Sequence, residues 1–149
     1  MTNPLAEPLF IDTNVLVFAN SISAPVSTDA RSRLNDLSNQ GAPLWISRQV
    51  LREYMATMSR SHTFQKPVLS AILIADIHRF QSQFLIAEDG PLVTNPLLKS
   101  IGSIPIGGKQ IHDANIVATT LAHGLRMLLT HHVIDFQRFA GTIDVIPMI

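Results

Sequence analysis

The sequence contains no cysteine and no excess of either charge. Without cysteine the chain cannot form disulfide bonds, thiolate zinc sites or a cysteine nucleophile, and this composition is compatible with a reducing cytosol. Its 11 Lys and Arg side chains balance its 11 Asp and Glu side chains, so the formal net charge is zero. Such a chain does not hold nucleic acid through overall charge, and a phosphate-containing partner needs a local patch or metal ions.

Long hydrophobic runs are also lacking, and we expect no secretory leader. The first residues, MTNPLAEPLFID, have no basic segment followed by an apolar run, which argues against a secretory signal peptide. The most apolar stretch, VLSAILIADI, is too short to span a bilayer and contains Asp76. With 46% hydrophobic and 15% charged residues among 149, the chain has the composition of one globular domain. We therefore expect a cytoplasmic protein without a membrane segment.

Short apolar runs alternate with segments of helical periodicity. The runs that we expect to form strands are residues 8–11, 42–47, 84–89, 126–130 and 143–147. The segments that we expect to form helices are residues 13–21, 27–40, 48–60, 67–82, 92–102 and 111–123, with a short helix or turn at 133–139. This alternation predicts an α/β fold, a three-layer α/β/α sandwich with a mainly parallel central sheet.

Three acidic residues stand beside the expected buried layers. Asp12 follows the first strand, Glu53 lies next to the core position Tyr54 on the helix after the second strand, and Asp113 lies next to Ala114 in the first turn of a later helix. Functional sites of parallel α/β sheets lie at the carboxyl edge of the strands, where Asp12 is expected.

Each acid also has a purely structural explanation. Asp12 can cap the following helix, the helix dipole favours Asp113, and Glu53 can pair with Arg52 or Arg60. Three carboxylates in one cleft, however, would repel one another, raise their pKa values and be stabilised by a divalent cation. Oxygen ligands, without cysteine or histidine at metal-ligand spacing, favour Mg²⁺ or Mn²⁺ over zinc.

Four segments occur in the order and spacing of PIN-domain ribonucleases: LFIDTNVLVF, ISRQVLREYM, IHDANIVATTLAHG and LLTHHVIDFQRF. Over nearly its whole length the chain resembles this family, and most closely the VapC-type toxins of bacterial toxin–antitoxin pairs. The resemblance implies one PIN-like nuclease domain over residues 1–149, with Asp12, Glu53 and Asp113 as catalytic and metal-binding residues. Thr13, Asn14 and Thr130 are either polar helpers of that site or only capping and turn residues.

The chain departs from the family pattern at one position. Many members carry Asn or Asp two residues after the Thr of the last motif, where this sequence has His132. His132 either contacts a phosphate or a water, or is a surface histidine. Asp135 either binds metal, lies behind the ligands or caps the turn at 133–138.

The resemblance further implies the chemistry and the partners. We expect an Mg²⁺- or Mn²⁺-dependent endoribonuclease that hydrolyses RNA phosphodiester bonds, with a tRNA or rRNA loop as substrate. It would be the toxin component of a type II toxin–antitoxin system, bound by its cognate antitoxin protein. The alternative is a PIN-fold protein-binding module with weak or no nuclease activity. Arg48, Arg52 and Lys109 either hold flanking phosphates or are solvated surface charges.

The helices that begin near Thr13 and Ser47 are rich in apolar residues. These include Val15, Leu16, Phe18, Met55 and Met58. We expect that one small core does not hold them all, which predicts a homodimer and a hydrophobic groove for an amphipathic antitoxin helix.

Overall fold

The computed structural model describes residues 6–61 and 65–149. Its five strands form one sheet in the order β3-β2-β1-β4-β5, and every pairing is parallel. The strands are β1 Leu9–Ile11, β2 Leu44–Ser47, β3 Leu85–Ala87, β4 Met127–Thr130 and β5 Asp144–Pro147. The first strand of the chain is therefore the central strand of the sheet.

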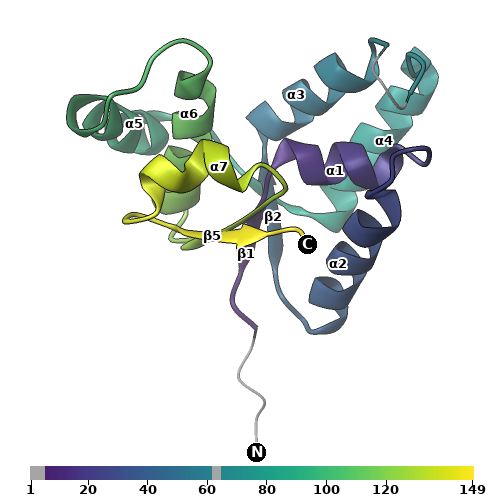
Figure 1. Cartoon of the computed structure of the whole chain (residues 1–149), viewed down its shortest axis with the longest axis horizontal. Helices are drawn as coiled ribbons and strands as arrows, with labels where there is room; N and C mark the ends of the chain where they lie inside the picture. Colours follow the sequence, from purple (N-terminus) through teal and green to yellow (C-terminus); the bar gives the residue numbers. More distant parts are fainter. Residues whose placement is uncertain (1–5, 62–64) are drawn as a thin grey trace, which may run out of the picture.

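The helices cover both faces of this sheet. They are α1 Thr13–Asn20, α2 Ser27–Asn39, α3 Arg48–Met58, α4 Ser70–Gln83, α5 Pro91–Ser103, α6 Gln110–Ala122 and α7 Val133–Phe136, followed by a 3₁₀ turn, Gln137–Phe139. In Figure 1, α1 to α4 lie on one side of the strands and α5 to α7 on the other. The predicted α/β fold with helices on either side of a parallel sheet is confirmed.

The element boundaries agree with those expected to within two residues, except at the start of α4. This helix begins at Ser70, whereas the periodicity predicts a start at residue 67. The backbone N–H of Val68 instead donates a 2.8 Å hydrogen bond to the carbonyl oxygen of Met58. Leu69 is extended, with φ −63° and ψ 144°. Because Val68 is bonded to the end of α3 and Leu69 is extended, α4 starts three residues late.

A glycine follows each of the helices α2 and α6, which precede β2 and β4, the two strands that flank β1. Gly41 after α2 and Gly124 after α6 have φ values of 80° and 72°. The next residue donates back into the last helical turn in both places, from Ala42 N to Leu37 O and from Leu125 N to Thr120 O. This C-terminal helix cap has a residue with positive φ, a conformation that favours glycine, and it directs the chain back to the sheet at β2 and β4.

The core holds some, but not all, of the apolar side chains singled out on the helices that begin at Thr13 and Arg48. Val15, Leu16 and Met58 are at most 1% exposed, and only Phe18 and Met55 of the five are half-buried. Three of the five side chains therefore lie in the core, and the other two lie partly outside it. The large apolar side chains left exposed on helices are mostly on α4 and α5: Ile72, Ile74, Leu92, Leu98 and Ile101. Within the described residues, every helix is too short or too polar to cross a membrane.

Candidate active site

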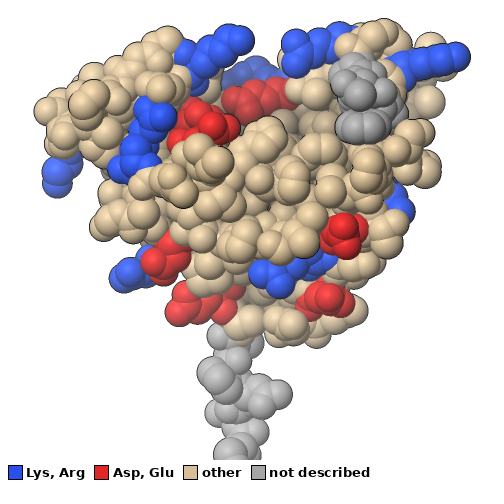
Figure 2. All heavy atoms as spheres, viewed as in Figure 1, with Lys and Arg blue, Asp and Glu red and all other residues tan. Residues whose placement is uncertain are grey.

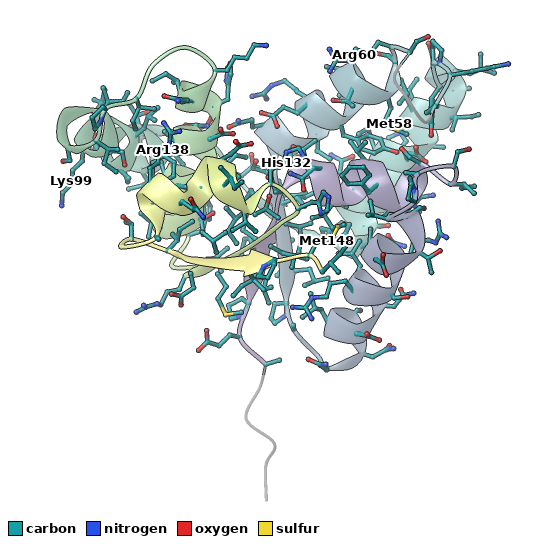
Figure 3. The ribbon with its side chains drawn as sticks, viewed as in Figure 1. Met58, Arg60, Lys99, His132, Arg138 and Met148 are labelled. Atoms are coloured by element: carbon teal, nitrogen blue, oxygen red, sulfur yellow. The ribbon has the colours of Figure 1, made fainter. Side chains whose placement is uncertain are left out.

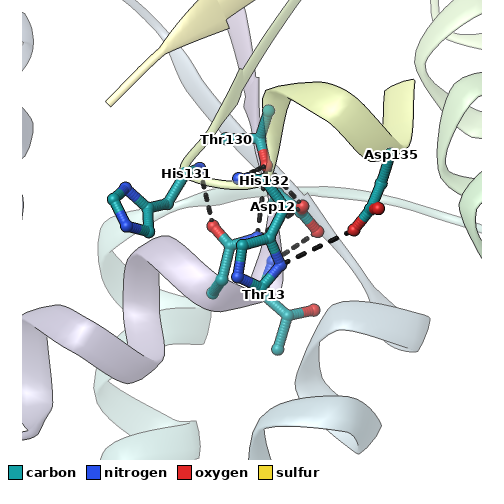
Figure 4. A network of polar contacts seen from close by, with 7 residues as sticks. Asp12, Thr13, Thr130, His131, His132 and Asp135 are labelled. Atoms are coloured by element: carbon teal, nitrogen blue, oxygen red, sulfur yellow. Dashed lines mark hydrogen bonds and ion pairs between the residues drawn. The ribbon is translucent and has the colours of Figure 1, made fainter. Parts of the chain in front are cut away.

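Asp12 lies at the carboxyl edge of the central strand and is only 7% exposed. It is the N-cap of α1, and its Oδ1 accepts a 2.8 Å hydrogen bond from the backbone N–H of Thr13. Its Oδ2 accepts a 2.9 Å bond from the hydroxyl of Thr130, the last residue of the neighbouring strand β4 (Figure 4). The parallel pairing of β1 with β4 thus brings together the strand ends that hold this carboxylate.

Asn14, on α1, forms hydrogen bonds with both Asp12 and Thr130. Its Nδ2 donates to Asp12 Oδ2 at 2.9 Å and to Thr130 Oγ1 at 3.2 Å, and its Oδ1 accepts from the backbone N–H of His131 at 3.0 Å. The backbone N–H of His132 also donates to Thr130 Oγ1, at 3.0 Å. Asn14 and Thr130 are therefore direct partners of the buried carboxylate, in addition to their roles in the turn.

Glu53 reaches the site from α3 and has a polar partner on each carboxylate oxygen. Thr13 Oγ1 donates to Oε2 at 2.7 Å, and Gln49 Nε2 donates to Oε1, also at 2.7 Å. In the described part of the chain, the ion pairs with Arg52 or Arg60 that the sequence allows do not form. Neutral donors hold this carboxylate, so its charge is not neutralised.

Asp113 in the first turn of α6 completes the group predicted from the sequence. Asp12, Glu53 and Asp113 line one depression of about 240 Å³, together with His132 and Asp135 at the start of α7. In Figure 2 acidic side chains lie in a notch at the top of the view, with basic side chains on either side of them. The structure thus brings together, from four segments of the chain, all the acids named from the sequence.

Burial is the main cause of the shifted ionisation of Asp12. It raises the pKa of this carboxyl from 3.8 to about 7, with smaller upward contributions from the charges of Glu53 and Asp113. Hydrogen bonds from Thr130 and Thr13 act in the opposite direction, because they stabilise the charged form.

Asp113 is shifted in the same direction. Burial raises its pKa from 3.8 to about 6, followed by the charges of Asp135 and Glu53, while Arg138 and His112 lower it. The sequence predicts repulsion as the reason for raised pKa values. Repulsion contributes at both carboxyls, but loss of solvent contributes more.

His132 and Asp135 occupy the open side of the depression. Their Nδ1 and Oδ2 atoms are 3.8 Å apart, and both side chains are about half exposed, 54% and 56% (Figure 4). Asp135 lies in the first turn of α7, so it both faces the depression and stands where a helix favours an acid.

The chemistry of these donors fits a hard divalent cation. They are crowded carboxylate oxygens, two of them on groups with raised pKa values, and a bound cation would relieve that crowding. Over residues 6–61 and 65–149, however, no three His, Asp or Glu side chains are arranged so that they could hold a metal ion. Hydrogen bonds from Thr13 and Gln49 hold the Glu53 carboxylate, and a hydrogen bond from Thr130 holds that of Asp12.

Of the three basic residues named from the sequence, Arg48 has a defined partner. Its guanidinium pairs with Glu88 after β3 at 2.7 Å, which directs it away from the acidic depression. The side chains of Arg52 and Lys109 are exposed and do not line the depression.

Two residues of the site, Gln49 and Asn115, were not predicted from the sequence. Gln49 is 7% exposed and contacts Glu53 one helical turn away, and Asn115 Nδ2 donates to Gln49 Oε1 at 2.7 Å. The sequence spacing could have indicated Gln49, because it precedes Glu53 by four residues and residues four apart on a helix lie on one face. Its neighbour on that face is an acid, and the next residue, Val50, is fully buried.

No protein-family model matches the sequence, and no curated protein matches it. Solved structures match it over nearly its full length. VapBC2 from Rickettsia felis, bound to a promoter DNA fragment, has a TM-score of 0.66 at 21% identity, covering 95% of this chain and 98% of that chain. VapBC-1 from nontypeable Haemophilus influenzae has a TM-score of 0.68 at 16% identity, covering 96% and 98%.

A third structure is that of Mycobacterium tuberculosis VapC20, described as a sarcin–ricin loop cleaving toxin. Its TM-score is 0.64 at 15% identity, with 91% of this chain and 95% of that chain covered. At these identities the likeness establishes the fold, and the fold expected from the resemblance to PIN-domain toxins is confirmed.

Proposed function

We propose that this chain is a divalent-metal-dependent endoribonuclease that hydrolyses RNA phosphodiester bonds and is the toxin of a type II toxin–antitoxin pair. The observation that carries the proposal is the convergence of Asp12, Glu53 and Asp113 on one depression at the carboxyl edge of a parallel sheet. The likeness in fold to toxin structures, one of them described as cleaving the sarcin–ricin loop, supports it.

Mg²⁺ or Mn²⁺ would be held by Asp12, Glu53 and Asp113. When bound, such an ion supplies an activated water and neutralises charge on the leaving oxygen. The chain's own polar groups prepare the carboxylates for that role. Thr130 lowers the pKa of Asp12 against the effect of burial and so favours the charged form that binds a cation.

The surroundings of the depression suit an RNA backbone. Because the chain as a whole is neutral, phosphates must be attracted locally, and basic side chains flank the acidic notch (Figure 2). Arg138 and Arg60, both exposed, lie on opposite sides of His132 in Figure 3. A depression open on one side accepts a single strand or a loop, so we propose a tRNA or rRNA loop as substrate.

We assign the antitoxin to a groove of about 410 Å³ between α1, α2 and α4. Apolar side chains that include Leu34 and Phe84 line it, with Arg31 and Arg79. Arg79 already pairs with Asp76 at 3.3 Å, whereas Arg31 donates only to uncharged oxygens. This combination suits an amphipathic helix that has an acidic residue beside its apolar face. Several of the similar structures are of toxin–antitoxin complexes.

The test of the nuclease proposal is cleavage of an end-labelled RNA hairpin by the purified chain with Mg²⁺, with Mn²⁺ and with a chelator. We expect cleavage that requires the metal. A chain that stays intact and folded but cuts neither hairpins nor single strands in either metal contradicts the proposal, and favours the alternative of a PIN fold that only binds proteins.

The test of the partner is separate. The product of the adjacent reading frame should co-purify with this chain, and Arg31→Glu should weaken that complex by reversing the charge of the groove. Arg126→Glu, on the opposite edge of the sheet beside Asp144, is the matched control. Equal retention of the partner by both variants would contradict the assignment of the groove.

A further inference from the structure

A side-chain bridge joins the two helices that carry Glu53 and Asp113. Gln49 Nε2 donates to Glu53 Oε1 at 2.7 Å and also to the carbonyl oxygen of His112 at 2.9 Å. Its Oε1 accepts from Asn115 Nδ2 at 2.7 Å. Both amide protons and the amide oxygen of Gln49 are thus engaged, two of the three contacts with α6 and one with the carboxylate on α3.

The bridge spans the two sides of the depression. In Figure 1, α3 and α6 stand apart above the sheet, with α3 on the side of α1 and α6 on the side of α5. His112 directly precedes Asp113, so the bond to its carbonyl oxygen fixes the turn of α6 from which Asp113 projects. Gln49 is 7% exposed and therefore lies below the surface of the depression.

Asn115 determines which way the Gln49 amide faces. On one side of that amide, the Nε2 group donates to two acceptors, Glu53 Oε1 and His112 O. On the other side, the amide oxygen accepts from Asn115 Nδ2. Turning the amide over would place its oxygen against two acceptors and its N–H group against a donor. Such a reversal leaves buried groups without partners and is costly.

We propose that Gln49, oriented by Asn115, is a positioning residue that holds Glu53 and sets the separation of Glu53 from Asp113. This proposal rests on the proposed nuclease function. The role of Gln49 is to hold two mutually repelling carboxylates in a fixed arrangement by linking Glu53 to the first turn of α6. Thr13 secures the other oxygen of Glu53, so Gln49 acts on the side of the carboxylate that faces α6.

Two variants test the bridge by different routes. Gln49→Met keeps the length and volume of the side chain but removes all three hydrogen bonds. Asn115→Asp keeps the shape but turns a donor into an acceptor, which favours the reversed Gln49 amide. Gln81→Met, on an exposed position of α4, is the control for the first change, and Asn35→Asp, exposed on α2, controls for the added negative charge of the second.

The first measurement is Mg²⁺ binding by titration calorimetry without RNA, at a temperature at which thermal unfolding shows every variant to be folded. We expect Mg²⁺ to bind about 10- to 100-fold more weakly to both bridge variants, as is typical when a residue behind a metal ligand is lost, and unchanged binding to both controls. The half-saturating Mg²⁺ concentration for RNA cleavage should rise by the same factor.

The second measurement needs neither metal nor activity. In the metal-free protein, the side-chain amide protons of Gln49 should exchange slowly by NMR, and Asn115→Asp should accelerate their exchange. A folded Gln49→Met protein that binds Mg²⁺ as tightly as the wild type would overturn the positioning role alone. A wild-type protein that binds no Mg²⁺, although its Gln49 amide is protected, would overturn the proposed function and the positioning role that rests on it.

Discussion

The hydroxyl of Thr130 and the carboxylate of Asp12 are joined by a 2.9 Å hydrogen bond between residues 118 apart in the sequence. The bond is buried and links the ends of two neighbouring parallel strands. It opposes the effect of burial on Asp12, because a donor to the carboxylate lowers the pKa that loss of solvent raises.

The first prediction concerns Thr130→Val. Valine keeps the shape of the buried side chain but removes one of the three hydrogen-bond donors to Asp12, so the pKa of Asp12 should rise further above about 7. The acidic limb of the pH profile of Mg²⁺-dependent cleavage should move to higher pH. The metal-free protein should lose about 1–3 kcal/mol of unfolding free energy. Thr142→Val, at an exposed turn, is the control, and coincident pH profiles would contradict the prediction.

The second prediction concerns the acids themselves. Asp12→Asn and Asp113→Asn should each abolish metal-dependent RNA cleavage while the circular dichroism spectrum stays that of the wild type, because each change removes a proposed metal ligand without removing volume. Asp144→Asn on the edge strand β5 should cleave normally. Wild-type cleavage rates in either site variant, with metal present, would show that the site assignment is wrong.

The third prediction concerns the stability of the metal-free protein. The folded-state pKa of Asp12, about 7, lies above its ordinary 3.8, so the folded state binds this proton more tightly than the unfolded state does. The resulting stabilisation is complete below pH 4 and is lost as pH rises through 7. Its upper limit is roughly 4 kcal/mol, at about 1.4 kcal/mol per pKa unit.

Chemical denaturation at a series of pH values measures this loss. The difference in unfolding free energy between the wild type and Asp12→Asn should change in favour of the variant as pH rises from 4 to 8. A difference that stays constant with pH would mean that Asp12 is not shifted. Mg²⁺ should restore stability to the wild type most strongly at high pH, because protons then compete least for the carboxylates.

The fourth prediction concerns assembly. The apolar residues first expected to drive a homodimer are largely in the core, but α5 buries only Val93 and leaves Leu98 60% and Ile101 40% exposed. We still predict a homodimer and now expect α5 to take part in it. Light scattering should give twice the mass of the chain at micromolar concentration. Leu98→Glu should give the mass of one chain, and Ile22→Glu, at an exposed loop, should not. A monomeric wild type would refute the prediction.

Much of this architecture follows from local patterns. Asp12 follows a short apolar run, and because such runs form parallel strands, it was expected at the carboxyl edge of the sheet. The helices ended by Gly41 and Gly124 were likewise predicted from residues close in sequence. These features depend on a few neighbouring residues, so a single sequence contains them.

The rest depends on contacts between distant segments. That β4, and not β5, pairs with β1 is decided by how whole layers pack. The dominance of burial in the pKa of Asp12 depends on what covers it. The link from Gln49 to α6 joins residues 63 and 66 positions apart, and a sequence that shows an ordinary glutamine at a helical position does not reveal its partner.

The place of β1 in the sheet also has a consequence for the making of the protein. Asp12 leaves the ribosome before Thr130 and the turn that carries His131, because Thr130 follows it by 118 residues. Because a chain emerges from its N-terminal end, the unfinished polypeptide holds its acids but lacks the strand that fixes the first of them. The hydrogen bond from Thr130 to Asp12 therefore forms only after β4 has left the ribosome, and until then the proposed site lacks its final arrangement.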